Sequence, residues 1–540
     1  MLAAAACPPL ALALGAEPEG GMGAVGGGVV DALPGLIESR LATSMRTADD
    51  ATLLFYRLRD FRPAWTRAEQ LDGLLEAVAS AGDHGLDSAD FALEALRAQA
   101  LEARAGLPVE RVAERELLFT DMLARLAQQL RHGKVDPRRL YRDWNFSMPA
   151  TAVEQAGRLA QLLDDGQTVG PGLAAAVQAQ APDVDLYRQL QLALKQYRVA
   201  AEAGDWPKVA AGPTLRPGER GARVAEVRAR LAAEGEPELA SSPDATLFDD
   251  ALAEAVKRFQ RRAGLALDAA IGRQTVEALN LGPVQRLAQI QVNLERVRWV
   301  AQDMRGDYLM VDLTGYQARL HRAGRLAWSA RAIVGKPTRQ TPSLLDSVRH
   351  LVLNPKWVVP PTILREDLIP GVIRDPDYLT RHRMRVVDRD GQAVDPQHID
   401  WEGARRHGFP HMIVQNSGAD GSLGRIKFAL ANPYSIYLHD TNARSSFRRD
   451  TRALSSGCVR LERPEELAVL LLDDARRWNA EALQEALATD KTRTVPVTRR
   501  IPVLLHYATA GLDEDGSLQF RPDIYARDAA VLAALRGPVR

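Results

Sequence analysis

The stretch that decides the fold runs Tyr434-Ser-Ile-Tyr-Leu-His439-Asp440 and is completed by Ser455-Ser-Gly-Cys458-Val-Arg460. Polar and apolar residues alternate from 435 to 439, which predicts a strand with Tyr437 and His439 on one face. Cys458 lies 19 residues after His439, a spacing that leaves room for a loop between two strands. If a second strand begins at Cys458, Arg460 points to the same side as the thiol. The pattern therefore predicts a thiol, an imidazole and a guanidinium in one cleft.

A cysteine beside a histidine has the chemistry needed for acyl transfer. A nearby histidine is expected to lower the pKa of the thiol and to produce the thiolate that attacks carbonyl groups. His439 would be the base, and it would return a proton to the departing amine. Gly457 lets the chain pass close to a substrate, and the backbone N–H groups of Gly457 and Cys458 are candidates for an oxyanion hole.

His439, the loop after it and Ser455-x-Gly457-Cys458-x-Arg460 resemble the signature of the YkuD-type L,D-transpeptidase catalytic domain, which remodels bacterial peptidoglycan. The segments Leu423-Gly-Arg-Ile-Lys-Phe428 and Tyr437-Leu-His-Asp-Thr441 resemble the large multidomain members of that family. Several separated motifs agree in order and spacing. This agreement favours the family over a buried structural cysteine with a satisfied histidine nearby.

The resemblance implies roles for the other residues of the motif. The backbone carbonyl of Asp440 would orient the His439 imidazole, since the side chains of adjacent strand residues point to opposite faces. Arg460 would hold a substrate carboxylate or the local loop, and Ser455 would brace that loop. The residues expected to contact substrate are Asn354 and Trp357, from a motif at the edge of the cleft, together with Tyr437, Ser455 and Ser456.

The reaction that the resemblance implies is a two-step transfer on peptidoglycan stem peptides. Cys458 would attack the carbonyl of the third, diamino-acid residue of a tetrapeptide donor and expel the terminal D-Ala. The side-chain amine of another stem would accept the acyl group and give a 3→3 cross-link. Water as acceptor would make the enzyme an L,D-carboxypeptidase, and an amine of an envelope protein would make it an attachment enzyme. The resemblance also implies inhibition by carbapenems, no cofactor, and other cell-wall synthesis enzymes as partners.

Two other classes of function stay open on the sequence. A zinc peptidase would need converging histidine and carboxylate ligands, but the close pair His407 and His411 is not followed by a glutamate in a metalloprotease pattern. We therefore expect no metal site. The second class is a non-catalytic peptidoglycan-binding scaffold, against which the intact set of Cys458, His439 and Arg460 argues.

Composition narrows the functional classes further. A length of 540 residues predicts roughly three or four domains. Lysine plus arginine and aspartate plus glutamate balance at 69 each, so no basic field points to nucleic acid as a partner. No apolar run long enough for an internal membrane span occurs after the N-terminus.

The N-terminal segment 1–29 is expected to be a secretory signal followed by a glycine-rich linker. Residues 1–16 carry no charged side chain and are rich in alanine and leucine, with Ala13-Leu-Gly15 as a cleavage candidate. A lipoprotein site at Cys7, the only cysteine besides Cys458, is the alternative. Either segment would place the protein in the periplasm or cell envelope.

The remaining chain is expected to be an α+β multidomain protein. Helical periodicity and family-like motifs indicate a helical scaffold domain over 30–210, and residues 211–282 resemble a three-helix peptidoglycan-binding module. In that module Ala269 stands where glycine is usual, and 235–246 looks inserted. A linker helix (283–303), a mostly-β catalytic domain (304–510) and a C-terminal extension (511–540) follow. Residues 362–422 are too long and too charged for a hairpin connection, which predicts an inserted cap subdomain.

Overall fold

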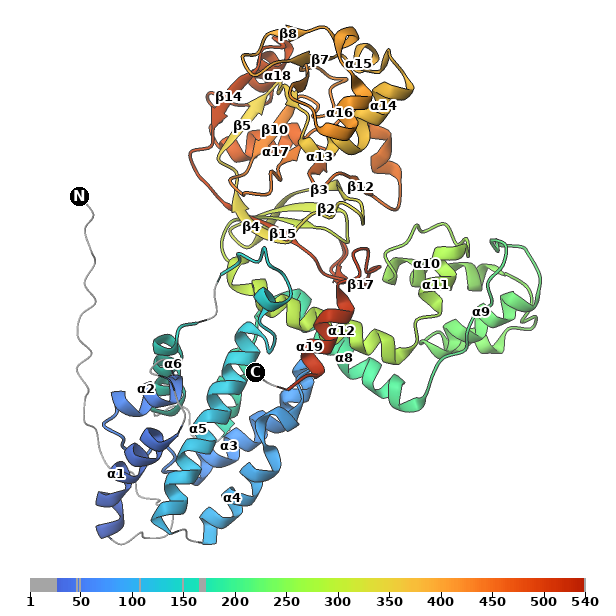
Figure 1. Ribbon diagram of the computed structural model, residues 1–540. Coiled ribbons are helices and arrows are strands. Elements are labelled where there is room, and N and C mark those ends of the chain that lie inside the picture. The colour runs from blue at the N-terminus through green and yellow to red at the C-terminus, as the bar shows by residue number, and fades with distance from the viewer. Residues whose placement is uncertain are drawn as a thin grey trace. The chain divides into compact units, whose positions relative to one another are not determined.

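The computed structural model describes residues 27–538 except 45–46, 48–49, 106–107, 148–149 and 165–170. The expected signal segment and Cys7 therefore lie outside the described residues. Helices fill the N-terminal half and a mostly-β domain fills much of the C-terminal half (Figure 1), which confirms the expected α+β class. Within the described ranges, every helix is too short or too polar to cross a bilayer.

The chain separates into two compact units, which are described one at a time. The first consists of Met1–Gly82, Leu86–Arg131 and Pro149–Ala181. The second consists of Asp83–Gly85, His132–Met148 and Pro182–Arg540.

Helices alone build the described part of the first unit. They are α1 (Gly27–Thr43), α2 (Ala51–Leu58), α3 (Ala68–Ala79), α4 (Leu93–Ala105), α5 (Val109–His132), α6 (Ala152–Asp164) and α7 (Pro171–Gln178). Helix α5 buries an apolar stripe, Phe119, Leu123, Leu126 and Leu130, at the spacing of a helical face. Its Glu116 is also fully buried, and the carboxylate accepts hydrogen bonds from the Tyr56 hydroxyl and the Ala64 and Trp65 backbone. These bonds offset the cost of burying its charge.

Helix α8 (Asp185–Ala203) is the first α-helix that lies wholly in the second unit, and it packs against α12 (Pro283–Val300). The buried Arg298 of α12 joins the two helices, since its guanidinium donates to the hydroxyl of Tyr187 of α8 at 2.9 Å. It also donates to Glu295 of its own helix at 2.9 Å. The sequence groups α8 with the scaffold domain, whereas these contacts place it in the unit that carries the β domain.

A three-helix module lies between α8 and α12 in the chain. It contains α9 (Ala222–Ala233), α10 (Asp250–Arg262) and α11 (Arg273–Leu279) around a core that includes Val227, Phe248 and Phe259. The backbone at Ala269 has a φ of 57°, the left-handed conformation that favours glycine. This conformation is the physical reason why a glycine is usual at that position.

An 11-stranded sheet forms the β domain, with the path β14-β5-β10-β11-β13-β3-β2-β1-β15-β4 and β12 paired to β3. Its strands are β1 (Tyr308–Asp312), β2 (Gln317–Arg322), β3 (Arg325–Gly335), β4 (Leu344–Ser347), β5 (His350–Leu353), β10 (Ile426–Ala429), β11 (Leu438–His439), β12 (Ala453–Ser455), β13 (Val459–Leu461), β14 (Arg493–Pro496) and β15 (Pro502–His506). Helices α17 (Pro464–Leu472) and α18 (Ala480–Ala488) bury their leucines in the core of this domain.

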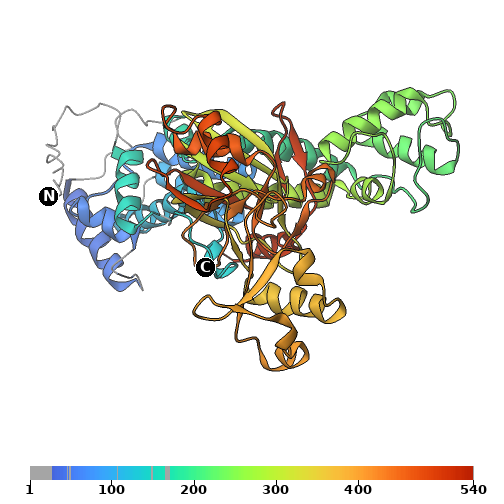
Figure 2. The same cartoon turned by 90° about the horizontal axis from the view of Figure 1, so that it is seen from above.

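The insertion between β5 and β10 has its own sheet, in the order β6-β9-β7-β8, and its own apolar core. Its elements are β6 (Trp357–Val358), α13 (Pro361–Ile363), a π-helical turn (Leu364–Leu368), α14 (Ile369–Arg374), α15 (Tyr378–Arg381), β7 (Met384–Val387), β8 (Ala393–Val394), α16 (Trp401–His407) and β9 (Met412–Gln415). In Figure 2 it projects from the sheet as a yellow-orange lobe. Strands β6 and β9 pair at its base, so its folded part begins and ends earlier than the expected range 362–422.

The C-terminal segment packs onto the same unit. Strands β16 (Ala510–Leu512) and β17 (Leu518–Phe520) form a hairpin, and helix α19 (Asp528–Arg536) follows. Ion pairs join the buried Arg521 to the buried Asp312, and the partly buried Asp528 to the buried Arg296, so this segment supports the β domain.

Candidate active site

Three neighbouring strands, β10, β11 and β13, position the side chains of the site. Lys427 lies directly opposite His439, and His439 lies directly opposite Arg460. Directly paired residues of adjacent strands point to the same face of a sheet, so these three side chains share one face. The fully buried Leu438 points to the other face and into the core.

Strand β11 is shorter than the sequence predicts, because a turn replaces its first residues. Ser435 has a φ of 57°, and the side-chain oxygen of Asn432 accepts hydrogen bonds from the backbone N–H groups of Tyr434 and Ile436 at 3.1 Å each. Tyr437 and His439 nevertheless lie side by side, with 5.5 Å between their ring centroids.

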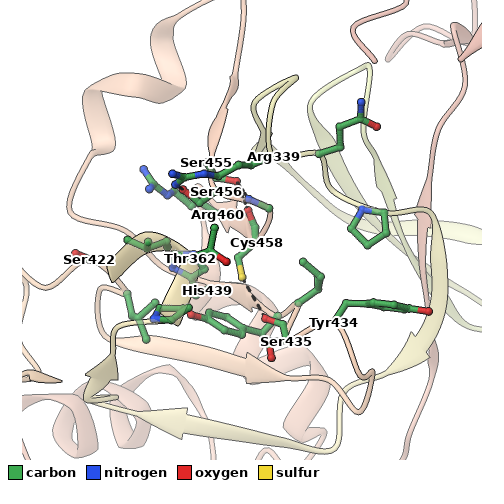
Figure 3. A pocket seen from close by; sticks show the side chains of 18 of the residues that line it. Arg339, Thr362, Ser422, Tyr434, Ser435, His439, Ser455, Ser456, Cys458 and Arg460 are labelled. Carbon is green, nitrogen blue, oxygen red and sulfur yellow. Dashed lines mark hydrogen bonds between the residues drawn. The ribbon is translucent and has the colours of Figure 1, made fainter. Parts of the chain in front are cut away.

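A cavity of about 650 Å³ opens above these strands (Figure 3). Eight of the ten residues assigned to the site from sequence line it: Trp357, Tyr437, His439, Ser455, Ser456, Gly457, Cys458 and Arg460. The side chains of Cys458, His439 and Arg460 are grouped together in Figure 3. The cleft thus contains the three chemical groups that the sequence pattern predicts.

The imidazole of His439 is oriented by the backbone. Its Nδ1–H donates to the Asp440 carbonyl oxygen at 2.5 Å, and this tautomer leaves Nε2 able to accept a proton. The Asp440 carboxylate is engaged elsewhere, since it accepts from the Arg425 backbone N–H at 2.8 Å and from the Arg444 guanidinium at 2.6 Å. The carboxylate therefore does not take the place of a triad aspartate.

Burial and the neighbouring cations set the protonation of the reactive pair. Burial, together with the positive charges of Arg460 and Lys427, lowers the pKa of His439 to about 3. Burial raises the pKa of the Cys458 thiol, against the opposing effects of Tyr437, Lys427 and Arg460. The resting pair is therefore a thiol and a neutral imidazole. The expectation that the histidine lowers the thiol pKa is wrong, because an uncharged imidazole offers a thiolate no opposite charge.

The loop before the cysteine is fixed by its own hydrogen bonds. Ser455 Oγ accepts from the Gly457 N–H at 3.1 Å, and its hydroxyl donates to the Cys458 carbonyl at 2.6 Å. Gly457 has a φ of 117°, a conformation that side-chain-bearing residues rarely adopt. Because Ser455 already occupies the Gly457 N–H, the expected oxyanion hole rests on the Cys458 N–H.

Arg460 carries a charge that the described protein groups leave largely unpaired. Its guanidinium is partly buried, and among the described residues none accepts a hydrogen bond from its Nε. Burial lowers the pKa of this guanidinium. A cation in such a position is suited to bind an anionic group of a ligand.

Asn354 does not reach the cavity, so the expectation that it contacts substrate is not supported. Its side chain is fully buried, and Nδ2 donates to the carbonyl of Leu487 at 3.0 Å, near the C-terminal end of α18. The φ of 48° at Asn354 turns the side chain towards that helix, and asparagine tolerates this conformation. Its role is to hold helix α18 to the sheet.

Replacing Asn354 by alanine should therefore destabilise the fold without disabling the thiol. The lost hydrogen bond and an unsatisfied buried carbonyl predict a decrease of about 1–3 kcal/mol in the free energy of unfolding, measured with urea. Asn354→Gly, which keeps the positive φ without strain, is the matched control for the backbone effect. Unchanged stability with loss of substrate binding would instead show that Asn354 contacts the substrate.

Sequence reasoning missed Arg339, which also lines the cavity. Its guanidinium donates to Ser456 Oγ at 2.9 Å and pairs with Glu366, at 2.7 Å, and Asp367 of the insertion. It thereby links the cysteine loop to the insertion. These partners are far apart in the sequence, and no local pattern marks the arginine.

The close pair His407 and His411, against which the sequence argues as zinc ligands, has no third ligand among the described residues. Across the part of the chain that the structure describes, no three His, Cys, Asp or Glu side chains gather closely enough to hold a metal ion. His407 ends helix α16 and His411 lies just before β9, where its ring packs against Phe409.

Family models match three parts of the chain. The L,D-transpeptidase catalytic domain matches residues 306–494, a scaffold domain matches 50–194, and a domain described as "Putative peptidoglycan binding domain" matches 220–279. The first match contains Trp357, His439, Cys458 and Arg460.

A curated protein is also similar to the chain. A Haemophilus influenzae protein described as "Putative L,D-transpeptidase" is 37% identical over 264 residues, which cover 48% of this chain and 53% of the relative. The chain thus spans about half the length of that curated relative.

Two solved structures of L,D-transpeptidases are also similar to it. The one from Xylanimonas cellulosilytica is 14% identical, and the match covers 55% of this chain and 100% of that chain, with a TM-score of 0.18. The one from Stackebrandtia nassauensis is 12% identical, and the match covers 55% and 96%, also with a TM-score of 0.18. The chain is therefore, on its domain matches, a multidomain protein with an L,D-transpeptidase catalytic domain, preceded by a scaffold domain and a peptidoglycan-binding-type domain.

Proposed function

We propose that the protein is a peptidoglycan L,D-transpeptidase that forms 3→3 cross-links through an acyl-enzyme on Cys458. One observation supports this most strongly. A thiol, an imidazole held by a backbone carbonyl, and an incompletely paired guanidinium converge on one cavity. Peptidoglycan stems would reach this site in the periplasm or cell envelope.

The geometry supports a two-step reaction. As the sulfur attacks the carbonyl carbon of the third stem residue, Nε2 of His439 accepts the thiol proton, and the Cys458 N–H stabilises the oxyanion. The imidazolium then gives this proton to the leaving amine of D-Ala, which leaves a thioester. In the second step His439 accepts a proton from the attacking side-chain amine, and the thiol is regenerated when the new amide forms.

The rest of the cavity is suited to a stem peptide. Arg460 would bind a carboxylate of the donor, while the aromatic rings of Tyr437 and Trp357 would pack against its aliphatic parts. Hydrolysis or attachment to an envelope protein would use the same acyl-enzyme with another acceptor. Carbapenems would acylate the same sulfur.

A reaction with purified muropeptides tests the proposal. Tetrapeptide stems incubated with the protein should yield 3→3 linked dimers and free D-Ala, measured by liquid chromatography and mass spectrometry. Stems that end at the third residue are the matched control, because they accept but have no D-Ala to release. Exclusive formation of the tripeptide would show that the protein acts as a carboxypeptidase. No change in any stem would contradict the proposal.

We further propose that the insertion is a cap over the cysteine. Trp357, Pro360, Pro361, Thr362 and Ile363 line the cavity, and they come from the start of the insertion. The salt bridges of Arg339 to Glu366 and Asp367 hold this wall beside the cysteine loop. A wall in this place would hold the stem and exclude water, which favours an amine acceptor over hydrolysis.

Removing the cap should change the product without disabling the thiol. Val358 and Val414 are directly paired, so a short Gly/Ser turn can replace residues 359–413 and close a hairpin. We expect Cys458 to react with iodoacetamide as before, and the product to shift from cross-linked dimer to hydrolysed stem. The double variant Glu366→Ala, Asp367→Ala, which breaks the links to Arg339, should shift the ratio in the same direction. An unchanged product ratio in the capless protein would contradict the cap.

A further inference from the structure

A second cation flanks the catalytic imidazole. Lys427 of β10 lies directly opposite His439 on one side, as Arg460 of β13 does on the other. The row of paired residues across the sheet is Val352, Lys427, His439 and Arg460. Both cations therefore share the face that carries the imidazole.

The ammonium group of Lys427 lies over the aromatic ring of Tyr437. Its Nζ lies 4.0 Å from the centroid of the Tyr437 ring. Tyr437 lines the same cavity as Cys458, whose thiol donates to the Ser435 carbonyl at 3.5 Å. Lys427 is partly buried between Ile426 and Phe428, which point into the core from the opposite face. An ordinary surface lysine would extend into solvent instead.

None of the described carboxylates lies within salt-bridge distance of Lys427. The carboxylate of Asp440, the residue after the strand partner of Lys427, is paired with Arg444 instead. The ionisable groups on the side of the sheet that Lys427 faces are Arg460, Tyr437, His439 and Cys458. Arg339 and Asp143 line the same cavity as these four. Strand β5 contributes the uncharged Val352. A partly desolvated ammonium without a counterion is costly, and the cost falls when a negative charge forms nearby. Here that charge is the thiolate.

We propose that Lys427 is a positioning residue whose charge adds to that of Arg460 in disfavouring an imidazolium at His439, and that it stabilises the Cys458 thiolate as it forms. Lys427 stays protonated throughout, and the thiol proton still passes to Nε2 of His439. This role rests on the proposed function, since it assigns Lys427 to the same nucleophile.

The sign of the effect follows from the charge. A positive charge favours a thiolate and disfavours an imidazolium, so removing it raises both pKa values. In Lys427→Met, the pH midpoint for alkylation of Cys458 by iodoacetamide should rise by about one pH unit, which corresponds to about tenfold slower alkylation near neutral pH. The imidazole pKa of His439, measured by NMR, should rise as well. Lys427→Arg keeps the charge and should restore most of the wild-type profile.

Arg493→Met is the matched control. Arg493 also contacts an aromatic ring, that of Trp478 at 4.9 Å, but its strand partner Leu353 pairs with Ile426, which puts Arg493 on the face opposite Lys427. It should leave the alkylation profile unchanged. A folded Lys427→Met protein with the wild-type profile would overturn the proposal, as would an equal shift in Arg493→Met.

The outcome separates this inference from the proposed function. Alkylation reports on the thiol whether or not stems are substrates. A shifted profile in a protein that never acylates on tetrapeptide stems would support the role of Lys427 and overturn the transpeptidase. Acylation by stems together with an unshifted profile would support the transpeptidase and overturn the role of Lys427.

Discussion

Cys458→Ser is expected to reduce acylation by tetrapeptide stems to background, although a hydroxyl is close to a thiol in size. A serine hydroxyl is far less acidic than a thiol, and it needs a strong base supported by a carboxylate. The site provides a single imidazole whose Nδ1–H is bonded to the Asp440 carbonyl oxygen, while the Asp440 carboxylate is bound to Arg444. The variant thus keeps the shape of the site and loses its nucleophile.

Release of D-Ala from a tetrapeptide measures this loss, with Cys458→Ala as the reference for zero nucleophile. The two variants should be indistinguishable. Cross-linking by the serine protein at a rate near that of wild type would show that the thiol is not required, and the mechanism would fail.

His439→Ala should reduce turnover roughly 10²- to 10⁴-fold, the usual effect of losing a positioned acid–base group. Because burial and the charges of Arg460 and Lys427 lower the pKa of His439 to about 3, the imidazole is uncharged near neutral pH and does not stabilise a thiolate by charge. Turnover should therefore fall while the pH profile for alkylation of Cys458 changes little.

His439→Gln is the control for structure, since its amide can still donate to the Asp440 carbonyl but cannot carry a proton. It should be as inactive as the alanine variant. A marked upward shift of the alkylation profile in either variant would reveal a thiolate–imidazolium pair and contradict the neutral resting state.

The contents of the cleft could be predicted because strand geometry is local. The two-residue period predicts Tyr437 beside His439 and Arg460 on the side of the thiol, although Tyr437 and Cys458 lie just before β11 and β13 and not within them. The family resemblance supplied the Asp440 carbonyl as the group that orders the imidazole, and the strand rule argued only against the Asp440 side chain. The helical and β halves were likewise visible in the periodicity of the sequence.

Tertiary structure decided what the sequence could not show. The thiol pKa depends on burial and on cations from other strands, so a rule for cysteine–histidine neighbours gave the wrong direction. Asn354 carries a positive φ that turns it towards α18. Arg339 and Lys427 gain their importance from partners in distant segments, and no local motif predicts these contacts.

Intact-mass measurement after incubation with a carbapenem tests the central claim most directly. The account predicts one covalent adduct per chain, mapped by peptide sequencing to Cys458 and absent from Cys458→Ser. An unmodified wild-type protein, or an adduct on any other residue, would contradict the assignment of Cys458 as the acylated nucleophile.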